Sequence, residues 1–444
     1  MSGKLVVRAA LEEAGLSAAA AVRFAARFDE LERRLERETQ TTGRRYAWFV
    51  PGRIELLGKH TDYAGGRSLI CAAERGFCVV SAERDDGRLS VTDAGRGRHV
   101  MIDAGQSSAD SGWSTYPRTV LRRLRRNFPD ANRGANVVFD NDLPSAAGLS
   151  SSSALMIAVL LPLIQVNGLE SSGEWTGNIR SAEDLAAYAA TIENGLTFRA
   201  LTGDAGVGTA GGSEDHTAIL CSRPGEVGQY AFCPTRHERS IPLPPELLLA
   251  VGVSGVAARK TGGARDDYNR ASERARRILD AWRAASCRDD SSLAAAVASS
   301  PDAVERLRHL LGARADGQEL VDRLDQFVAE STMLVPTAGD QLAAADLDGL
   351  GTTVAQSQDL AERLLGNQVA ETVALARMAR EEGAVAASAF GAGFGGSVWA
   401  LVERSTADAF LERWRTAYHH AHPTHTARAE FFLTPPGPAA IRLS

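Results

Sequence analysis

The chain has 444 residues, of which 44% are hydrophobic and 23% are charged. This composition is typical of a soluble globular protein, and the length favours two domains of roughly 200 residues each over a single core. The net charge of −6 and the isoelectric point near 5.9 argue against a general nucleic-acid binder, so we expect a small-molecule partner.

The N-terminal segment and the cysteines set further limits. Charged residues interrupt the apolar positions of the N-terminal segment, and no apolar run is long enough to span a bilayer. We therefore expect a cytoplasmic protein without a membrane partner, present as a monomer or a weak homo-oligomer. The five scattered cysteines have no metal-ligand spacing and are typical of reduced, mostly buried thiols.

Residues 1–45 are predicted to form an N-terminal helical segment packed on the first domain, because apolar residues repeat there at helical spacing. A strand is expected to follow over 46–50. Further strands are expected over 77–83, 89–93 and 135–140, and helices over 115–127, 151–167 and 181–194.

The segment 51–66, PGRIELLGKHTDYAGG, follows the first strand and is predicted to be a loop. It places Arg53, Lys59, His60 and Asp62 among glycines, so these side chains are presented rather than buried. Such a composition suits the recognition of hydroxyl groups. The alternative is a solvated loop whose charges pair with one another.

The stretch 143–154, LPSAAGLSSSSA, lies between a predicted strand and an apolar helix. Small residues let backbone N–H groups gather around a phosphate, and a helix N-terminus favours an anion. One serine is enough to cap a helix, whereas Ser150 to Ser153 are four in a row. We interpret the stretch as a phosphate loop that differs from the Gly-Lys-Ser/Thr type.

Residues 203–218, GDAGVGTAGGSEDHTA, place Asp215 after several glycines, where a carboxylate could act as a base or simply remain solvated.

Prolines over 236–245 indicate a domain boundary, so we assign 46–240 to an N-terminal domain and 241–444 to a C-terminal domain. The second domain is expected to start with a strand over 247–253 and to be rich in helices. Its glycine loop over 390–396 lacks the spacing of a dinucleotide-binding fingerprint.

Three motifs in fixed order resemble those of the GHMP small-molecule kinases and, within them, the galactokinase family. They are PGRIELLGKHTDYAGG (51–66), LPSAAGLSSSSA (143–154) and SAFGAGFGGS (388–397), which are similar to that family's sugar loop, phosphate loop and C-terminal glycine loop. The resemblance extends from about residue 46 to the end of the chain. It implies an α+β, two-domain GHMP-kinase-like fold with the active site in the interdomain cleft.

The resemblance also implies a sugar-1-kinase that uses ATP and Mg²⁺, with galactose as the first expected substrate. The implied catalytic residues are Asp215 as base and Arg53 as the cation beside it. The implied sugar-binding residues are Lys59, His60, Asp62 and Tyr268. Phosphate would be held by Gly148, Leu149, Ser150 and Ser151, with Gly391, Gly393 and Gly395 allowing the second domain to approach. Mg²⁺ would be held by Ser152 and Glu193.

Two departures from the family pattern bear on the substrate. Lys59 stands where the family has a glutamate that contacts the C6 end of the sugar, and the chain has only two other lysines. An ammonium there raises the hypothesis of galacturonate or another C6-modified sugar, unless Lys59 turns outward or donates to the same hydroxyl. The segment 212–216, GSEDH, replaces the usual Gly-Ile-Met-Asp-Gln and keeps the aspartate.

A third hypothesis, of a different class, is a sensor that binds sugar and ATP without turnover. Degenerate phosphate-loop serines or a missing base would favour it. The intact serines and the retained Asp215 argue for the enzyme instead.

Overall fold

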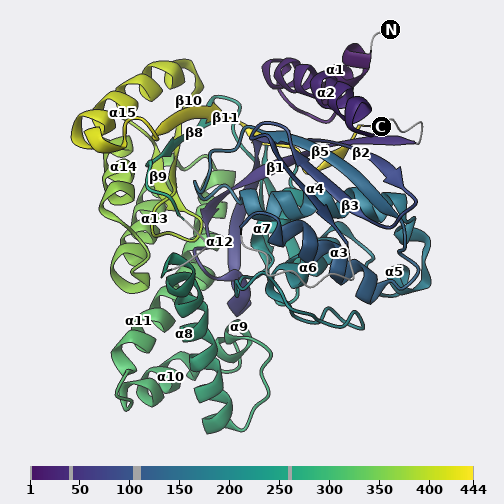
Figure 1. Ribbon diagram of the computed structural model, residues 1–444. Coiled ribbons are helices and arrows are strands. Elements are labelled where there is room, and N and C mark those ends of the chain that lie inside the picture. Colours follow the sequence, from purple (N-terminus) through teal and green to yellow (C-terminus); the bar gives the residue numbers. More distant parts are fainter. Residues whose placement is uncertain (1–2, 40–43, 104–111, 259–262, 444) are drawn as a thin grey trace.

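The structure is a computed structural model that describes residues 3–39, 44–103, 112–258 and 263–443 (Figure 1). Within these residues the strands form a nine-stranded sheet and a four-stranded sheet. Helices cover both sheets, so the chain has an α+β fold, as the sequence predicts. No helix in the described ranges has both the length and the apolar character needed to cross a membrane.

The larger sheet is organised around two long neighbouring strands, β1 and β2. Its main order is β13-β1-β2-β5-β3-β4, with β12 and the β6–β7 hairpin also joined to β2. Neighbours pair antiparallel except β3 and β5. The strands are β1 (Arg45–Leu57), β2 (Arg67–Arg84), β3 (Leu89–Asp93), β4 (Arg98–Ile102), β5 (Gly134–Asn141), β6 (Glu226–Ala231), β7 (Arg236–Pro242), β12 (Pro436–Gly437) and β13 (Ile441–Arg442).

Strand β1 is longer than predicted and takes in the first half of the expected loop. The strand continues past Pro51 through a register shift between Pro51 and Arg53, which accommodates a residue without an N–H donor. Gly52 lies so close to the phosphate loop that an added Cβ would stand 2.9 Å from the carbonyl oxygen of Leu149. Arg53 is therefore held on a rigid strand, and the loop itself begins at Gly58.

Helices pack on both faces of the larger sheet (Figure 1). The N-terminal segment forms two helices, because Gly15 breaks it with a φ of +99°. The second of them buries Phe24 and Phe28 against Phe49 of β1 and neighbouring strands. The helices are α1 (Gly3–Glu13), α2 (Ala18–Thr39), α3 (Thr115–Asn127), α4 (Ser151–Val166), α5 (Gly173–Asn178), α6 (Ala182–Asn194) and α7 (Glu214–Cys221), with short turns η1 (Asp62–Ala64) and η2 (Leu169–Ser171).

The smaller sheet has the order β11-β8-β10-β9, all antiparallel, and packs against α14 and α15. Its strands are β8 (Leu247–Val253), β9 (Ala386–Phe390), β10 (Ser397–Glu403) and β11 (Glu430–Thr434). The later helices are α12 (Val335–Ala343), α13 (Leu347–Leu360), α14 (Ala370–Glu381) and α15 (Ala407–Ala421), with the π-helix η4 (Ala361–Leu365) and the turns η5 (Arg404–Thr406) and η6 (Pro423–His425).

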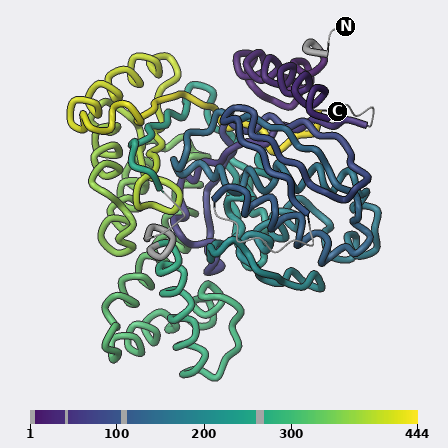
Figure 2. The backbone as a smooth tube through the Cα atoms, in the orientation of Figure 1, coloured from purple at the N-terminus to yellow at the C-terminus, as the bar shows by residue number. Residues whose placement is uncertain are grey.

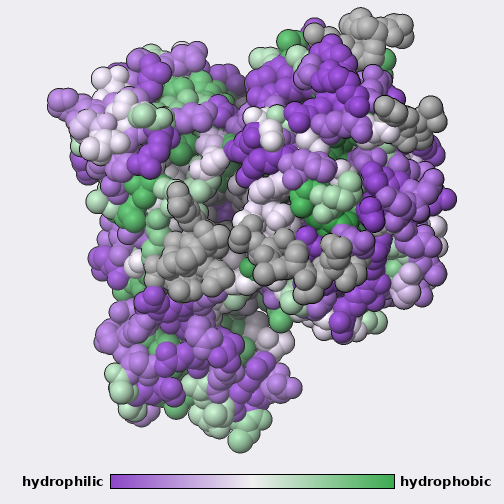
Figure 3. Space-filling view, in the orientation of Figure 1, coloured by the Kyte–Doolittle hydropathy of each residue, from purple (hydrophilic) through white to green (hydrophobic). Residues whose placement is uncertain are grey.

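A separate group of helices forms the lower lobe of the molecule (Figure 2). It comprises α8 (Gly263–Ser286), α9 (Leu293–Val297), α10 (Ala303–Gly312) and α11 (Gly317–Val328). Helix α11 continues directly into the π-helix η3 (Ala329–Leu334). Its own core gathers Ile278, Trp282, Leu307, Leu324 and Phe327. The surface of this lobe that faces the viewer in Figure 3 is mostly hydrophilic.

The last residues of the chain return to the first domain. After β11 in the smaller sheet, β12 pairs with β2 and β13 pairs with β1. The expected division at 240/241 falls inside β7, shortly before β8 begins the smaller sheet, and β12 and β13 return to the larger sheet. This pairing has no local sequence signal because it is made between ends of the chain.

Candidate active site

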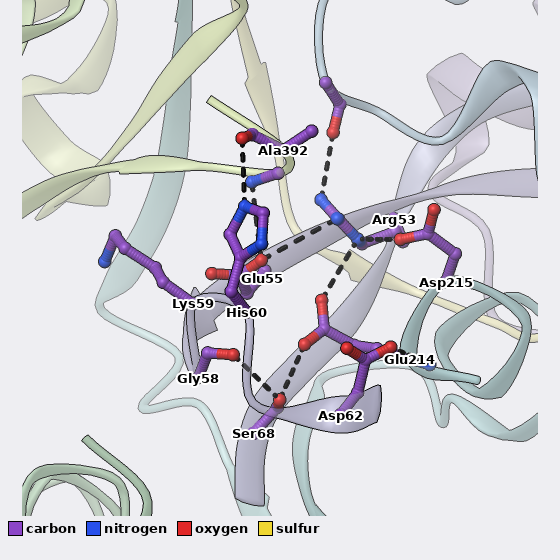
Figure 4. A network of polar contacts seen from close by, with 12 residues as sticks. Arg53, Glu55, Gly58, Lys59, His60, Asp62, Ser68, Glu214, Asp215 and Ala392 are labelled. Atoms are coloured by element: carbon purple, nitrogen blue, oxygen red, sulfur yellow. Dashed lines mark hydrogen bonds and ion pairs between the residues drawn. The ribbon is translucent and has the colours of Figure 1, made fainter. Parts of the chain in front are cut away.

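Arg53 and Asp215 meet at the centre of the site, although 162 positions separate them in the chain. Nε of Arg53 on β1 donates to Oδ1 of Asp215, in the first turn of α7, over 2.7 Å. Nη1 donates to the carbonyl oxygen of Gly148 over 2.9 Å. One buried guanidinium therefore links the expected base to the phosphate loop (Figure 4).

Further carboxyl groups surround this pair. Oε1 of Glu214 lies 3.4 Å from Nε of Arg53, and Oε2 of Glu55 lies 3.7 Å from Nη2. Burial raises the pKa of Glu214 well above its ordinary value, with Glu55 adding to the effect, and burial also raises the pKa of Glu55 and of Asp62. Burial acts to lower the pKa of Arg53, but Asp215, Glu214 and Glu55 together raise it. The guanidinium thus stays charged, while the raised pKa values of Glu55, Asp62 and Glu214 favour the protonated form of these three carboxyl groups.

A small cavity of about 40 Å³ lies on one side of Asp215, and its lining includes Asp62, His60 and Tyr268. Nε2 of His60 lies 3.0 Å from the carbonyl oxygen of Ala392, and Nδ1 lies 2.9 Å from the hydroxyl of Tyr63. Because a carbonyl only accepts, Nε2 carries the proton and Nδ1 accepts from Tyr63. The ring of Tyr268 stands 5.3 Å from that of His60. The cavity offers hydrogen-bonding groups to a small polar ligand.

Lys59 does not join the other residues of its loop at this cavity. Its side chain is buried, and Nζ donates to Oγ of Ser357 in α13 over 3.0 Å. Figure 4 shows it pointing away from Arg53 and Asp215. Gly58 has a φ of +114° and His60 a φ of +59°, and this sharp turn sends consecutive side chains to opposite sides. Lys59 therefore does not line the small cavity, although the sequence predicts it beside the sugar.

The phosphate loop is held against Arg53 by its backbone. The carbonyl oxygen of Leu149 accepts from the Arg53 N–H over 3.2 Å, and the side chain of Leu149 is in the core. Oγ of Ser150 is buried and has no hydrogen-bond partner among the described residues. Such an orphaned hydroxyl at the start of α4 fits a phosphate oxygen.

A larger cavity of about 660 Å³ adjoins the phosphate loop, a volume within the usual range for ligand sites. Ser150, Ser151 and Ser152 line it. Its apolar walls, which lie outside the three sequence motifs, are formed by Phe77, Trp113, Tyr116 and Phe139. Trp113 precedes a predicted helix, but only the fold brings it to the phosphate loop. Flat aromatic walls beside a phosphate site suit a nucleotide.

The expected glycine loop approaches the site at Gly391 and Ala392. A Cβ on Gly391 would lie 3.0 Å from the carbonyl oxygen of Gly148, so the two loops meet backbone to backbone. The other two glycines serve the second domain itself. A Cβ added at Gly393 would lie 2.2 Å from the carbonyl oxygen of Asn367. One added at Gly395 would lie 2.7 Å from the carbonyl oxygen of Val256. Neither Gly393 nor Gly395 lines the two cavities.

Glu193 lies beside the phosphate loop, where its carboxylate bonds two hydroxyl groups. Oε2 accepts from Oγ of Ser153 over 2.9 Å, and Oε1 accepts from Oγ1 of Thr209 over 3.3 Å. The expected partner was Ser152, which instead lines the larger cavity. Within the described ranges, no three His, Cys, Asp or Glu side chains form a metal-binding group. An oxygen set this small fits Mg²⁺, which keeps waters and phosphate oxygens as its remaining ligands.

Comparison with known proteins first gives the class of the fold. The GHMP kinases N terminal domain matches residues 115–216, and the GHMP kinases C terminal domain matches residues 340–420. The crystal structure of Lactococcus lactis galactokinase complexed with galactose covers 93% of this chain and 99% of its own, with a TM-score of 0.73 at 20% identity. The structure of L. major mevalonate kinase in complex with R-mevalonate covers 90% and 98%, with a TM-score of 0.53 at 16% identity. The chain therefore has the two-domain GHMP kinase fold.

The sequence relatives narrow the class. The galactokinase galactose-binding signature matches residues 36–83. The galactokinase of Roseiflexus sp. (strain RS-1) is 28% identical over 84% of this chain and 87% of its own length. That of Chloroflexus aggregans is 29% identical over 83% and 87%. The chain belongs to the GHMP kinase superfamily and, within it, to the galactokinase family.

Proposed function

We propose that the protein transfers the γ-phosphoryl group of ATP to the C1 hydroxyl of a monosaccharide, with galactose as the substrate. One observation carries the proposal: Arg53, Asp215 and Ala392 line both cavities. A nucleotide in the larger cavity and a sugar at the residues around the smaller one, which must widen beyond about 40 Å³ to admit a hexose, would meet at Asp215. Phosphoryl transfer depends mostly on such positioning and on charge stabilisation.

In this mechanism Asp215 accepts the proton of the attacking sugar hydroxyl. Arg53 donates to Asp215 through Nε, which keeps the carboxylate ionised and oriented. The rest of the same guanidinium faces the phosphate loop, where it stabilises charge that develops during transfer. His60, Asp62 and Tyr268 hold the sugar hydroxyls in the small cavity.

Backbone groups around Gly148 and the hydroxyls of Ser150 and Ser151 cradle the phosphates. Mg²⁺, held by Glu193 with a serine hydroxyl, supplies charge neutralisation to the phosphate oxygens when bound. The aromatic walls around Trp113 receive the adenine ring.

The alternative substrate, galacturonate, depended on an ammonium facing the sugar. The position of Lys59 outside the small cavity supports the neutral sugar instead. The pairing of Asp215 with Arg53 argues against the sensor hypothesis, because a protein that only binds its ligands needs no such base.

The test is ADP release from ATP–Mg²⁺ with galactose, galacturonate, glucose, N-acetylgalactosamine and arabinose. We expect turnover with galactose above all others. Turnover with galacturonate alone would replace the substrate. Sugar binding without turnover of any panel member would identify a sensor.

A further inference from the structure

One face of the helix formed by α11 and η3 lies against the backbone of residues 58–60, the start of the sugar loop. Nη2 of Arg323 donates to the carbonyl oxygen of His60 over 2.6 Å. Nε2 of Gln326 donates to the carbonyl oxygen of Lys59 over 3.2 Å. Arg323 and Gln326 are fully buried, so these bonds are shielded from water.

Glu330, the next residue on this face, completes the contact from η3. Its Oε1 accepts from the N–H of Gly58 over 2.8 Å and from the N–H of Lys59 over 3.4 Å. The three polar side chains are spaced three and four residues apart, which places them in one row along the helix. η3 is a π-helical segment, a form found frequently at functional sites.

The same carboxylate is linked to the side chain of Lys59 through one hydroxyl. Oγ of Ser357 donates to Oε1 of Glu330 over 2.9 Å and accepts from Nζ of Lys59 over 3.0 Å. Glu330, Ser357 and Lys59 are each at most 1% exposed. A buried carboxylate or ammonium is costly by itself, so the two opposite charges stabilise one another through the hydroxyl of Ser357.

This arrangement gives a reason for the lysine at position 59. A glutamate there, in the same conformation, would bring a second carboxylate towards Glu330 in a buried environment, where like charges repel strongly. Lys59 therefore matches Glu330 rather than a substrate group.

We propose that Lys59, Ser357 and Glu330 are positioning residues through which the second domain fixes the sugar loop. By holding the backbone at 58–60, they direct His60 and Asp62 into the small cavity beside Asp215. The proposal rests on the proposed function for its kinetic readout. It predicts that this group of residues controls sugar binding without touching the sugar.

The test compares Lys59→Met, Glu330→Gln, the double variant and Ser357→Ala by steady-state kinetics with galactose and ATP. Loss of either charge should raise the KM for galactose about tenfold or more, and Ser357→Ala should raise it by a smaller factor. The KM for ATP should change less than about twofold. Because the charges act as a unit, the double variant should be no more than about threefold worse than the poorer single variant. Glu74→Gln, which removes a buried carboxylate bonded to Ser17 far from the loop, is the matched control and should leave both KM values unchanged.

Three results would overturn the proposal. Equal losses for galactose and ATP would indicate general damage, and full additivity of the two charge changes would separate Lys59 from Glu330. A changed ratio of kcat/KM between galactose and galacturonate in Lys59→Met would show that Lys59 reads the substrate directly.

Calorimetric binding of galactose and a double-mutant cycle on the thermal unfolding midpoint do not require turnover. If the wild-type protein turns over no sugar, the proposed function fails. The unfolding cycle then still decides whether Lys59 and Glu330 act together, because independent charges would give additive shifts.

Discussion

The guanidinium of Arg53 bonds the carboxylate of Asp215 and the backbone of Gly148 at the same time. Arg53 sits on a strand of the larger sheet, and Gly148 in turn lies against Gly391 of the second domain. A single side chain therefore ties the proposed base to the contact between the two domains.

Asp215→Asn should lower kcat by about 10²–10⁴-fold because an amide cannot accept the sugar proton. Galactose affinity should remain within a few-fold of wild type, since the side chain keeps its size and its place beside Arg53. Stopped-flow ADP release and calorimetric sugar binding measure the two effects. Asp204→Asn, which changes an acid paired with Arg122 outside both cavities, serves as control. A near-normal rate in Asp215→Asn would remove Asp215 from the role of base.

Glu214→Gln should change how stability depends on pH. Burial raises the pKa of Glu214 in the folded state above its unfolded value of 4.5, so the folded state binds the proton more tightly. Stability from this group is present below pH 4.5 and is lost as the pH rises towards the folded pKa. Measured across a window of roughly pH 5 to 9, the variant should therefore gain thermal stability relative to wild type as the pH rises above the unfolded value of Glu214.

The control for this prediction is Asp86→Asn. Asp86 is exposed to solvent, and its hydrogen bond with Arg84 lowers its pKa to about 2. Its removal should shift the unfolding midpoint equally at every pH in the window. Parallel curves for wild type and Glu214→Gln would contradict the assignment of a raised pKa to Glu214.

Gly148→Ala should weaken nucleotide binding. Gly148 has a φ of +78°, and a Cβ there would lie 3.1 Å from the carbonyl oxygen of Phe390. Gly168 has a φ of +58° and open space around it, so Gly168→Ala carries the backbone strain without the contact. Each should cost about 1–3 kcal/mol of stability, but only Gly148→Ala should lose ATP affinity. Equal ATP affinities, measured by calorimetry with a non-hydrolysable analogue, would show that the loop contact does not matter for binding.

Glu193→Gln should raise the Mg²⁺ concentration that gives half-maximal rate by on the order of tenfold, because a neutral amide is a weaker ligand for a hard cation. Titration of the ADP-release rate with Mg²⁺ measures this change, and chelation by EDTA should abolish turnover in every variant. Ser152→Ala and Ser153→Ala compare the expected serine with the one that bonds Glu193. The serine whose loss raises the required Mg²⁺ concentration as Glu193→Gln does is the one that binds the cation. An unchanged Mg²⁺ dependence in Glu193→Gln would show that Glu193 does not bind it.

Local pattern predicted much of the secondary structure. The helix over 115–127 and the strand over 247–253 have the predicted bounds, because a charged helix face and a short apolar run are properties of neighbouring residues. Motif order likewise predicted several residues that line the two cavities, but Lys59, Gly393 and Gly395 line neither of them. Pro51 and Gly52, however, resemble a loop, and only pairing with β2 makes them part of a strand.

The remaining features of the site arise from contacts between distant segments. No spacing rule indicates that Glu55 and Glu214 share Arg53, or that Ser153 rather than Ser152 meets Glu193. The side chain of Lys59 is directed by its bond to Ser357, which lies 298 positions away. Charge type at a motif position therefore predicts the presence of a partner but not which partner it is.

The pairing of β13 with β1 also bears on biosynthesis. Ribosomes deliver the N-terminal strands first, and domains generally fold in that order as they emerge. Here the edge of β1 at Trp48 and Phe49 gains its strand partner only when residues 441–442 have been made, and an unpaired edge invites pairing with other chains. In the growing chain, this part of the β1 edge therefore stays open to pairing with other chains until residue 442 has been made.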